Sequence, residues 1–138
     1  IFLPGYGGWG GERGPSSPRR KVENPTFEEE FHIAENLPVL YRLTGDRHPV
    51  HIDPEVAASY GFDRPILHGL CTLGIAARQL AFAAGSQPWE LSELSVRFAA
   101  PVFPGKAMNL IAECDANGIV FEARSDSESV LSNGYARF

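Results

Sequence analysis

Cysteine is scarce in this sequence. The two cysteines, Cys71 and Cys114, lie far apart, with no C-x-x-C pair and no neighbouring histidine-cysteine cluster. Disulfide frameworks and zinc sites normally show closely spaced cysteines or histidines. The sequence therefore favours neither, and a reducing cytoplasm is the expected compartment.

Long hydrophobic runs and an excess of basic residues are also missing. No apolar run approaches the ~20 residues that a membrane-spanning helix needs. Twelve basic residues against seventeen acidic ones give a net charge of -5, which would repel a phosphate backbone. We expect no membrane span and no nucleic-acid partner.

The beginning of the chain lacks the features of a domain core. The chain starts at Ile1 without a signal-peptide pattern, so we expect a fragment or a processed piece. Residues 4–20 are rich in glycine, proline, serine and arginine, which favour turns and extended backbone. We expect residues 1–24 to form a linker or arm, in which Tyr6 and Trp9 either dock on a neighbouring surface or stay exposed. Residues 25–138 then form one domain.

Hydrophobic spacing predicts the elements of that domain. Residues 68–84 keep apolar residues three and four positions apart, which predicts a long, mostly buried helix. Shorter helices are expected at 37–43 and directly after Pro54. Asn117-Gly118 is the strongest hairpin signal, and turn residues separate the expected strands, at 26–33, 91–98, 107–114, 119–125 and 130–138. This order indicates an α+β fold, with an antiparallel sheet wrapped around a central helix.

Residues 41–54, with the sequence YRLTGDRHPVHIDP, crowd four chemically active side chains into eight positions: Asp46, His48, His51 and Asp53. The glycine and proline nearby bend the backbone out of regular structure. We therefore expect Asp46 and His51 to converge on one water molecule. A carboxylate and an imidazole can take one proton from that water and return another, as addition of water to a conjugated double bond requires.

Purely structural roles for Asp46 and His51 fit the spacing of this segment equally well. Asp46 would then cap a turn, and His51 would be a structural histidine with a backbone partner. A metal site is the weaker interpretation, because no third distant ligand stands out.

Gly69 lies at the start of the long helix, within DRPILHGLCTLG at 63–74. A helix N-terminus carries about half a unit of positive charge and free N–H groups. The Gly69 amide is thus placed to polarise a thioester carbonyl and to hold the enolate oxygen that forms on attack by water. The alternative is that Gly69 only allows tight packing at the helix start.

These residues support a family resemblance. YRLTGDRHPVHIDP followed by GFDRPILHGLCTLG resembles the hydratase-2 motif of the MaoC-like (R)-specific enoyl-CoA hydratases. The resemblance extends from about Phe27 to the C-terminus and includes VRFAAPVFPG at 96–105 and LSNGYARF at 131–138. It implies a hotdog fold around the long helix.

The resemblance also implies an activity and roles for residues. The family adds water reversibly to a trans-2-enoyl-CoA, giving an (R)-3-hydroxyacyl-CoA, without cofactor or metal. Asp46 and His51 would be the catalytic pair, Gly69 the oxyanion-hole amide and Phe98 a wall of the acyl-CoA pocket. Arg97 and Lys106 are candidates for contact with CoA phosphates, although exposed basic residues are more often only solvated. Arg64, Gln79 and Trp89 receive no predicted role.

His48 departs from the family pattern, which usually has asparagine in GD-x-N-P-L-H. Histidine can donate a hydrogen bond to Asp46 or to the thioester region, so we count His48 among the substrate-binding residues. It can also become charged near ~pH 6 to 7, and the charged form would favour ionised Asp46. We expect an altered pH profile.

Pairing with a second hotdog unit, identical or different, is a further implication of the family. The family often builds one active site from two hotdog units, and this chain has room for one. Its opening, IFLPGYGGWGGERG, resembles a connector between tandem halves. Two alternative functions stay open, namely dehydration of a 3-hydroxyacyl-CoA or acyl-carrier-protein thioester, and a non-catalytic hotdog subunit that binds acyl-CoA and completes a partner's site.

Overall fold

A computed structural model describes residues 7–12 and 18–138. Tyr6 of the predicted arm lies outside these residues, and Trp9 is 83% exposed. Among the described residues, none of the helices combines the length and the apolar character that crossing a bilayer requires.

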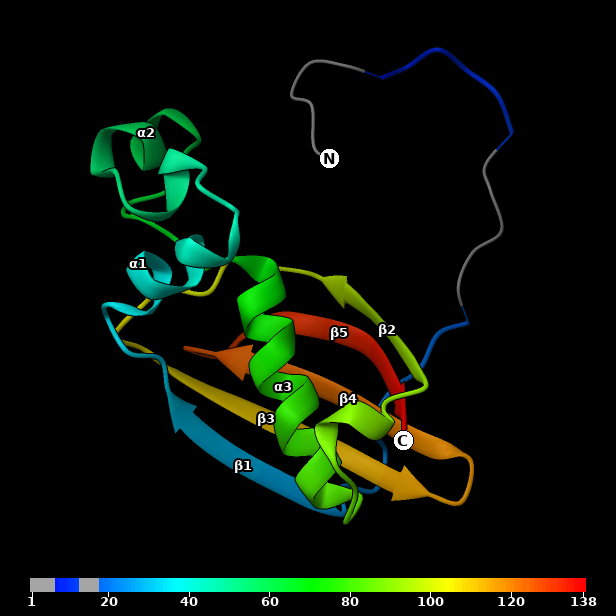
Figure 1. The fold of residues 1–138 in the computed structure, drawn as a ribbon. Coiled ribbons are helices and arrows are strands. Elements are labelled where there is room, and N and C mark those ends of the chain that lie inside the picture. Colours follow the sequence, from blue (N-terminus) through cyan, green and yellow to red (C-terminus); the bar gives the residue numbers. More distant parts are fainter. Residues whose placement is uncertain (1–6, 13–17) are drawn as a thin grey trace.

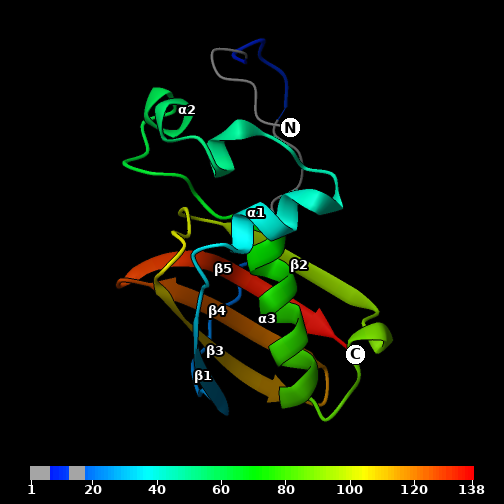
Figure 2. The same cartoon turned by 60° about the vertical axis from the view of Figure 1, so that its left-hand side comes forward.

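The sheet has five strands in the order β1-β3-β4-β5-β2, and every neighbouring pair is antiparallel (Figure 1). The long helix α3, Gly69–Ala83, crosses the concave face of this sheet (Figure 2). The strands are β1 Phe27–His32, β2 Glu93–Phe98, β3 Ala107–Asp115, β4 Gly118–Ser125 and β5 Glu128–Arg137. The predicted α+β architecture, an antiparallel sheet wrapped around a central helix, is confirmed.

Two tight turns connect the three long strands. The predicted hairpin between β3 and β4 forms, but its loop residues are Ala116 and Asn117, one position earlier than expected, and Gly118 begins β4. The reason is Asp115, whose Oδ1 accepts the N–H groups of Asn117 and Gly118 at 2.6 and 3.1 Å. Because this carboxylate organises the turn, the glycine is free to pair across the strands.

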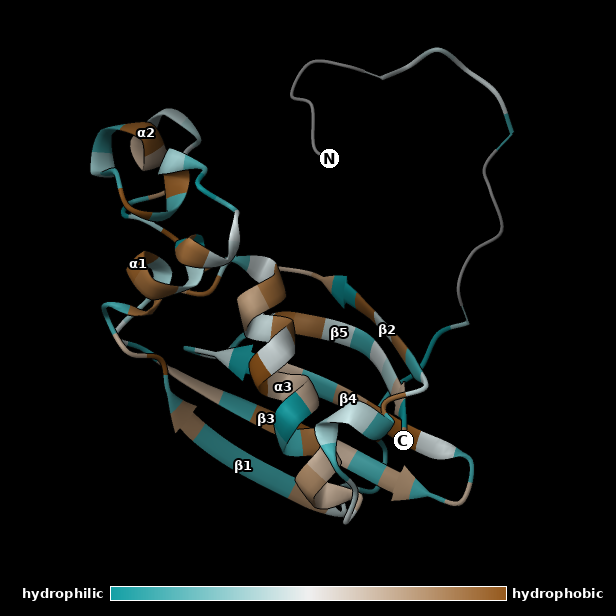
Figure 3. Cartoon of the chain, viewed as in Figure 1, coloured by the Kyte–Doolittle hydropathy of each residue, from teal (hydrophilic) through white to brown (hydrophobic). Residues whose placement is uncertain are grey.

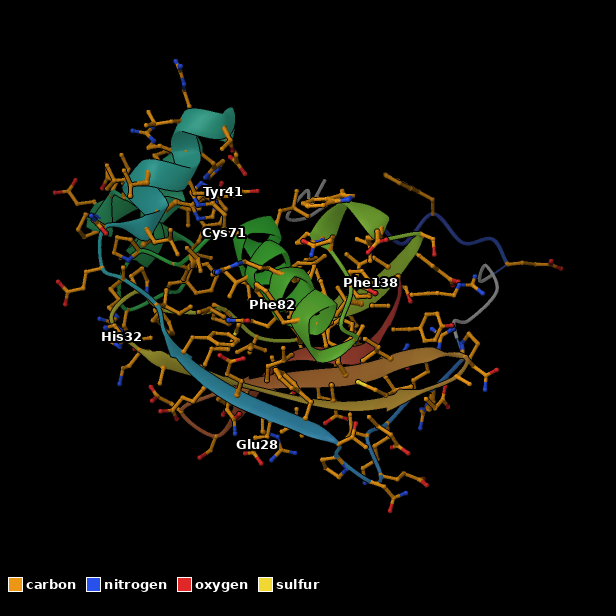
Figure 4. All side chains as sticks on the ribbon, turned by 60° about the horizontal axis from the view of Figure 1, so that its bottom comes forward. Glu28, His32, Tyr41, Cys71, Phe82 and Phe138 are labelled. Carbon is orange, nitrogen blue, oxygen red and sulfur yellow. The ribbon has the colours of Figure 1, made fainter. Side chains whose placement is uncertain are left out.

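The core lies between α3 and the sheet. Buried residues of α3, including Ala76 and Leu80, belong to the same apolar cluster as Met108, Leu110 and Phe121 of the strands. The prediction that α3 is mostly buried was wrong on one side of the helix: Leu70 is 66% and Phe82 is 60% exposed. These two residues, with Gly74 and Arg78, recur every four positions and so share one stripe. The sheet covers only the opposite side of α3. Phe82 of the exposed stripe is labelled in Figure 4.

The segment 37–66 stands beyond one end of the sheet, near the N-terminus of α3 (Figure 1). It contains α1, Leu37–Tyr41, the 3-10 helices η1, Arg42–Thr44, and η2, Pro49–His51, and α2, Pro54–Ser59. The two predicted short helices are thereby confirmed. Asp53 starts α2, because its Oδ1 accepts the N–H groups of Glu55 and Val56 and so satisfies free donors of the first turn.

The last residues of the predicted arm pack on the outer face of the sheet. The Arg20 guanidinium lies 4.4 Å from the centre of the Tyr135 ring and donates to Ser95 Oγ at 3.2 Å. Glu113, two strands away, accepts the N–H groups of Asn24 and Glu23, and these hydrogen bonds lower the pKa of Glu113. Residues 18–24 therefore run across the sheet from the β2 edge toward β3.

Candidate active site

Asp46 lies on irregular backbone between η1 and η2. Gly45, with φ at 131°, supplies the turn that leads into it. Asp46 Oδ1 accepts the N–H group of His48 at 3.1 Å, and the side chain is 57% exposed. The carboxylate is thus held by its own loop and stays open to water.

His51 ends η2, and its side chain is only 11% exposed. Its Nδ1 lies 2.8 Å from the carbonyl oxygen of Ile66. A carbonyl can only accept, so Nδ1 carries the hydrogen and the free lone pair of the neutral ring is on Nε2. That Nε2 faces Asp46 Oδ2 at 4.0 Å. A water at the usual ~2.8 Å from both atoms fits this spacing.

Burial lowers the pKa of His51 below its usual value, and the hydrogen bond to the Ile66 carbonyl opposes this effect only in part. An imidazole in a partly dry site resists charging because its charged form loses more hydration. His51 therefore remains neutral at physiological pH, as a proton acceptor must.

His68 is a site residue that the sequence analysis missed. It is 1% exposed, and its ring stacks on His51 with centroids 3.6 Å apart and planes 21° apart. Its Nε2 lies 3.1 Å from the backbone oxygen of Asp46. His68 thus supports both members of the pair, and the ring of Tyr41, which Figure 4 labels, packs against it at 4.8 Å. The available signal was a third histidine directly before Gly69.

Asp46, His51 and His68 bring three possible donor atoms within 4.8 Å of one another. The lone pairs of imidazole lie in the plane of the ring. Because the two rings are nearly parallel, their lone pairs run side by side instead of converging on one point. The cluster therefore fits a metal ion poorly and suits proton transfer.

An apolar cavity of about 470 Å³ lies beside His51. Its walls include Gly69 and Thr72 of α3, Phe98 of β2, and Leu131 of β5. Gly69 begins α3, so it is among the residues whose N–H groups have no partner within the helix. A Cβ at Gly69 would lie 3.3 Å from the Phe98 ring. The structure thus brings together His51, Gly69 and Phe98, three of the predicted site residues.

His48 takes a different position from the cavity-lining residues. Its Nδ1 accepts the N–H group of Val50 at 3.2 Å, and its ring packs edge-on against Tyr60, the residue that follows α2, at 5.6 Å. A direct contact between His48 and substrate stays a prediction.

A second cavity, of about 360 Å³, lies on another side of His51 and is lined by Arg64, Pro65 and Glu35, among others. Arg64, for which no role was predicted, lies with its guanidinium 5.2 Å from the Phe103 ring centre. Lys106 instead pairs with Asp126 at 2.9 Å. His51 therefore stands between an apolar cavity and a more polar one whose wall carries both Arg64 and Glu35.

Comparison with known proteins places this geometry in a family. The model of the MaoC like domain matches residues 18–133. Peroxisomal multifunctional enzyme type 2 of Mus musculus is 37% identical over 98% of this chain, and the probable enoyl-CoA hydratase 2 of Dictyostelium discoideum is 37% identical over 99%. The chain spans 19% and 49% of those two proteins.

Solved structures give the same result. A MaoC-like dehydratase from Phytophthora capsici superposes with a TM-score of 0.85 at 31% identity, over 97% of this chain and 49% of that one. The α+β hotdog fold is therefore established, with the histidine-aspartate site at one end of its central helix. Since the family model covers most of the chain, including α3, the segment 37–66 and all of the sheet up to residue 133 of β5, this chain belongs to the MaoC-like domain family.

Proposed function

We propose that the chain is a hydro-lyase that adds water reversibly to a trans-2-enoyl-CoA to give an (R)-3-hydroxyacyl-CoA. The observation that carries the proposal is the facing pair of Asp46 Oδ2 and His51 Nε2, next to an apolar cavity. The Dictyostelium relative is named as a probable enoyl-CoA hydratase 2, which agrees with this reaction.

The chemistry follows from where the proton acceptors and donors lie. Neutral His51 takes a proton from a water held between Nε2 and the Asp46 carboxylate. The hydroxide oxygen bonds to C3, and the electrons of the double bond move onto the thioester oxygen. The amide of Gly69 at the positive end of α3 stabilises that oxygen. The pair then returns the proton to C2, so all atoms of water are added.

The (R) configuration and the substrate class are the finer parts of the proposal. Asp46 and His51 both come from the segment 37–66, so the hydroxyl and the proton approach one face of the double bond. The Gly69 amide would fix which face that is by holding the thioester oxygen. The apolar cavity suits an acyl chain, and the cavity with Arg64 suits the CoA side.

We also propose that a second hotdog unit, identical or different, pairs along β2. The opposite edge strand, β1, carries Glu28, Glu29 and Glu30 and is largely hydrophilic in Figure 3. Charged residues protect an exposed edge from pairing. The β2 edge carries Leu94, Val96 and the half-exposed Phe98, so a partner there would also cover the open side of the acyl cavity. In this arrangement residues 1–24 are the arm and residues 25–138 are the hotdog domain.

Dehydration of a 3-hydroxyacyl thioester is the same equilibrium from the other side, and the name of the Phytophthora neighbour, a MaoC-like dehydratase, favours testing it. Substrates on CoA and on acyl-carrier protein would separate the two carriers. The cytoplasmic compartment stays a prediction.

The experiment follows the loss of conjugated-thioester absorbance with crotonyl-CoA and longer trans-2-enoyl-CoAs, with the product's configuration read by an (R)- or (S)-specific dehydrogenase. Asp46→Asn keeps the acceptor for the His48 N–H group but removes the charge, and should lower turnover by roughly 10²- to 10⁴-fold. Asp53→Asn is the matched control, because it keeps the α2 cap outside the reacting pair. Equal rates for both variants would overturn the proposal. Silence of the folded wild type, alone and with a partner, would favour the non-catalytic subunit.

A further inference from the structure

His48 is connected to both members of the catalytic pair through backbone groups. Its N–H group donates to Asp46 Oδ1 at 3.1 Å. Its ring Nδ1 accepts the N–H group of Val50 at 3.2 Å and so caps η2, the helix that ends at His51. His48 therefore joins the carboxylate loop through its backbone and the start of η2 through its side chain.

This cap depends on the protonation state of the His48 ring. Nδ1 accepts a hydrogen bond only through its lone pair, so the hydrogen of the neutral ring is on Nε2. Protonation places a hydrogen on Nδ1, where it would face the Val50 N–H group. Two donors pointing at each other cannot share a hydrogen bond, and the Val50 residue is buried. The charged ring must then turn away.

The helix that would lose its cap is short. η2 has three residues, and its remaining backbone bonds include His51 N–H to His48 at a long 3.4 Å and Ile52 N–H to Pro49 at 3.0 Å. A single capping acceptor is therefore a large part of what fixes η2. Displacing it moves the backbone of His51, and with it the distance from Nε2 to Asp46.

Two titratable side chains face the ring: Tyr60, directly after α2, packs edge-on at 5.6 Å, and His51 lies edge-on at 6.3 Å between ring centres. The Asp46 carboxylate accepts the backbone N–H group of His48. A charge on His48 would repel a second charge on His51 and attract the Asp46 carboxylate. The first effect keeps His51 neutral, as the reaction needs, whereas the second draws the carboxylate toward His48, so inactivation by acid depends on loss of the Val50 cap and displacement of the carboxylate.

We propose that His48 is a positioning residue that holds η2 through its unprotonated Nδ1, so that uptake of a proton by His48 withdraws His51 from its working position. Activity on the acid side is then controlled by two imidazoles, one that reacts and one that positions. The activity readout of this proposal rests on the proposed function, whereas the capping switch itself does not.

The first test is the pH profile of kcat in the full chain. His48→Asn keeps an acceptor two bonds from Cβ but cannot take up a proton in this range, and His48→Ala removes the acceptor. Loss of a cap corresponds to roughly a five- to ten-fold effect, so we expect His48→Ala to lose about that factor in kcat where the wild-type His48 is neutral, with the deficit narrowing as pH falls, and His48→Asn to recover most of it.

The shape of the acid limb separates a positioning role from a merely structural one. Wild type should fall more steeply than a single protonation allows, whereas His48→Asn should follow a single protonation with its midpoint at lower pH. His32→Asn, on the exposed side of β1, is the matched control and should follow wild type. A single-proton limb that is the same in wild type and His48→Asn would overturn the proposal.

A second measurement needs no catalysis and no folded His48→Ala variant. In NMR spectra of the wild type, the amide resonances of Val50 and His51 should move with the titration of the His48 ring, and in His48→Asn this movement should disappear. Val50 and His51 amides that ignore the His48 titration would overturn the capping switch. If these amides respond but no enoyl-CoA is hydrated, the proposed function fails and the switch stands.

Discussion

The segment 37–66 and the sheet with α3 are held together by different forces. In the sheet, backbone ladders and a continuous buried cluster that includes Met108, Leu110 and Phe121 fix every strand. In the segment 37–66, the fully buried apolar residues are few, Val50 and Ala57 among them. Side chains that bond to backbone, Asp46, His48 and Asp53, do much of the organising there.

This difference places chemistry and stability in separate parts of the molecule. The residues proposed to react, Asp46 and His51, occupy the segment with the smaller apolar contribution, so single polar contacts decide their geometry. The apolar core that contributes most to the free energy of unfolding lies mainly between α3 and the sheet. Substitutions in the two regions should therefore change different measurements.

The largest effect should come from the sheet. Phe121→Ala removes a fully buried ring and should lower the free energy of unfolding by about 3–5 kcal/mol, since a cavity remains. Urea unfolding measures this, while kcat per folded molecule should stay near wild type. Trp89→Ala, at an 80% exposed position, should change stability by less than about 0.5 kcal/mol. A large drop in kcat with an unchanged free energy of unfolding for Phe121→Ala would contradict the conclusion that the sheet core sets stability and the segment 37–66 sets activity.

Two glycines of α3 offer a sharper comparison, because the same change has opposite consequences. Gly74→Ala places its Cβ in open space and should stabilise the helix by up to about 1 kcal/mol. Gly69→Ala places its Cβ 3.3 Å from the Phe98 ring, so it should disturb the cavity wall and raise KM about a few-fold, by analogy with other small steric changes in apolar pockets. Thermal unfolding and steady-state kinetics on both variants check this. If Gly69→Ala has the same KM as wild type, the prediction that Phe98 forms a wall of the acyl pocket is wrong.

The sequence alone proposed Asp46, His51, Gly69 and Phe98 because each stands in a short motif whose chemistry is local; the structure places Asp46 opposite His51 and lines one cavity with the other three, and their roles stay predictions. His68 was missed because its role depends on the ring of a residue 17 positions earlier, and no local pattern reports such stacking. The exposed stripe at Leu70 and Phe82 was missed because apolar spacing shows which helix face is hydrophobic, not how much of it the sheet covers.

The turns also depend on contacts that a local sequence pattern does not report. The Asn117-Gly118 signal found the right hairpin but not its loop residues, because the Asp115 carboxylate sets the turn. The turn between β4 and β5 uses Asp126 and Ser127 at φ of 47° and 69°, although neither residue is glycine. Strand pairing on both sides holds them in a conformation that their side chains disfavour.

The smallest expected effect concerns pH and stability. Burial lowers the pKa of His51 in the folded state, so the unfolded chain, with a pKa near the usual ~6.5, binds more protons. Stability should therefore fall as pH drops below that value toward the folded pKa of His51. His51→Gln should show a shallower loss of urea midpoint over this range than wild type. An identical slope would mean that the His51 ring is hydrated like an exposed histidine.

The anchoring of Arg20 on Tyr135 and Ser95 has a practical consequence for anyone who handles this protein. The described segment that begins at residue 18 is anchored beside β2, because Arg20 donates to Ser95 of that strand. A bulky affinity tag or fluorescent fusion joined upstream would be delivered to the edge where a partner unit is expected. The C-terminal end is also beside this strand, because Arg137 pairs with Glu93 of β2, so recombinant versions intended for measurements of assembly should have any tag removed by a protease.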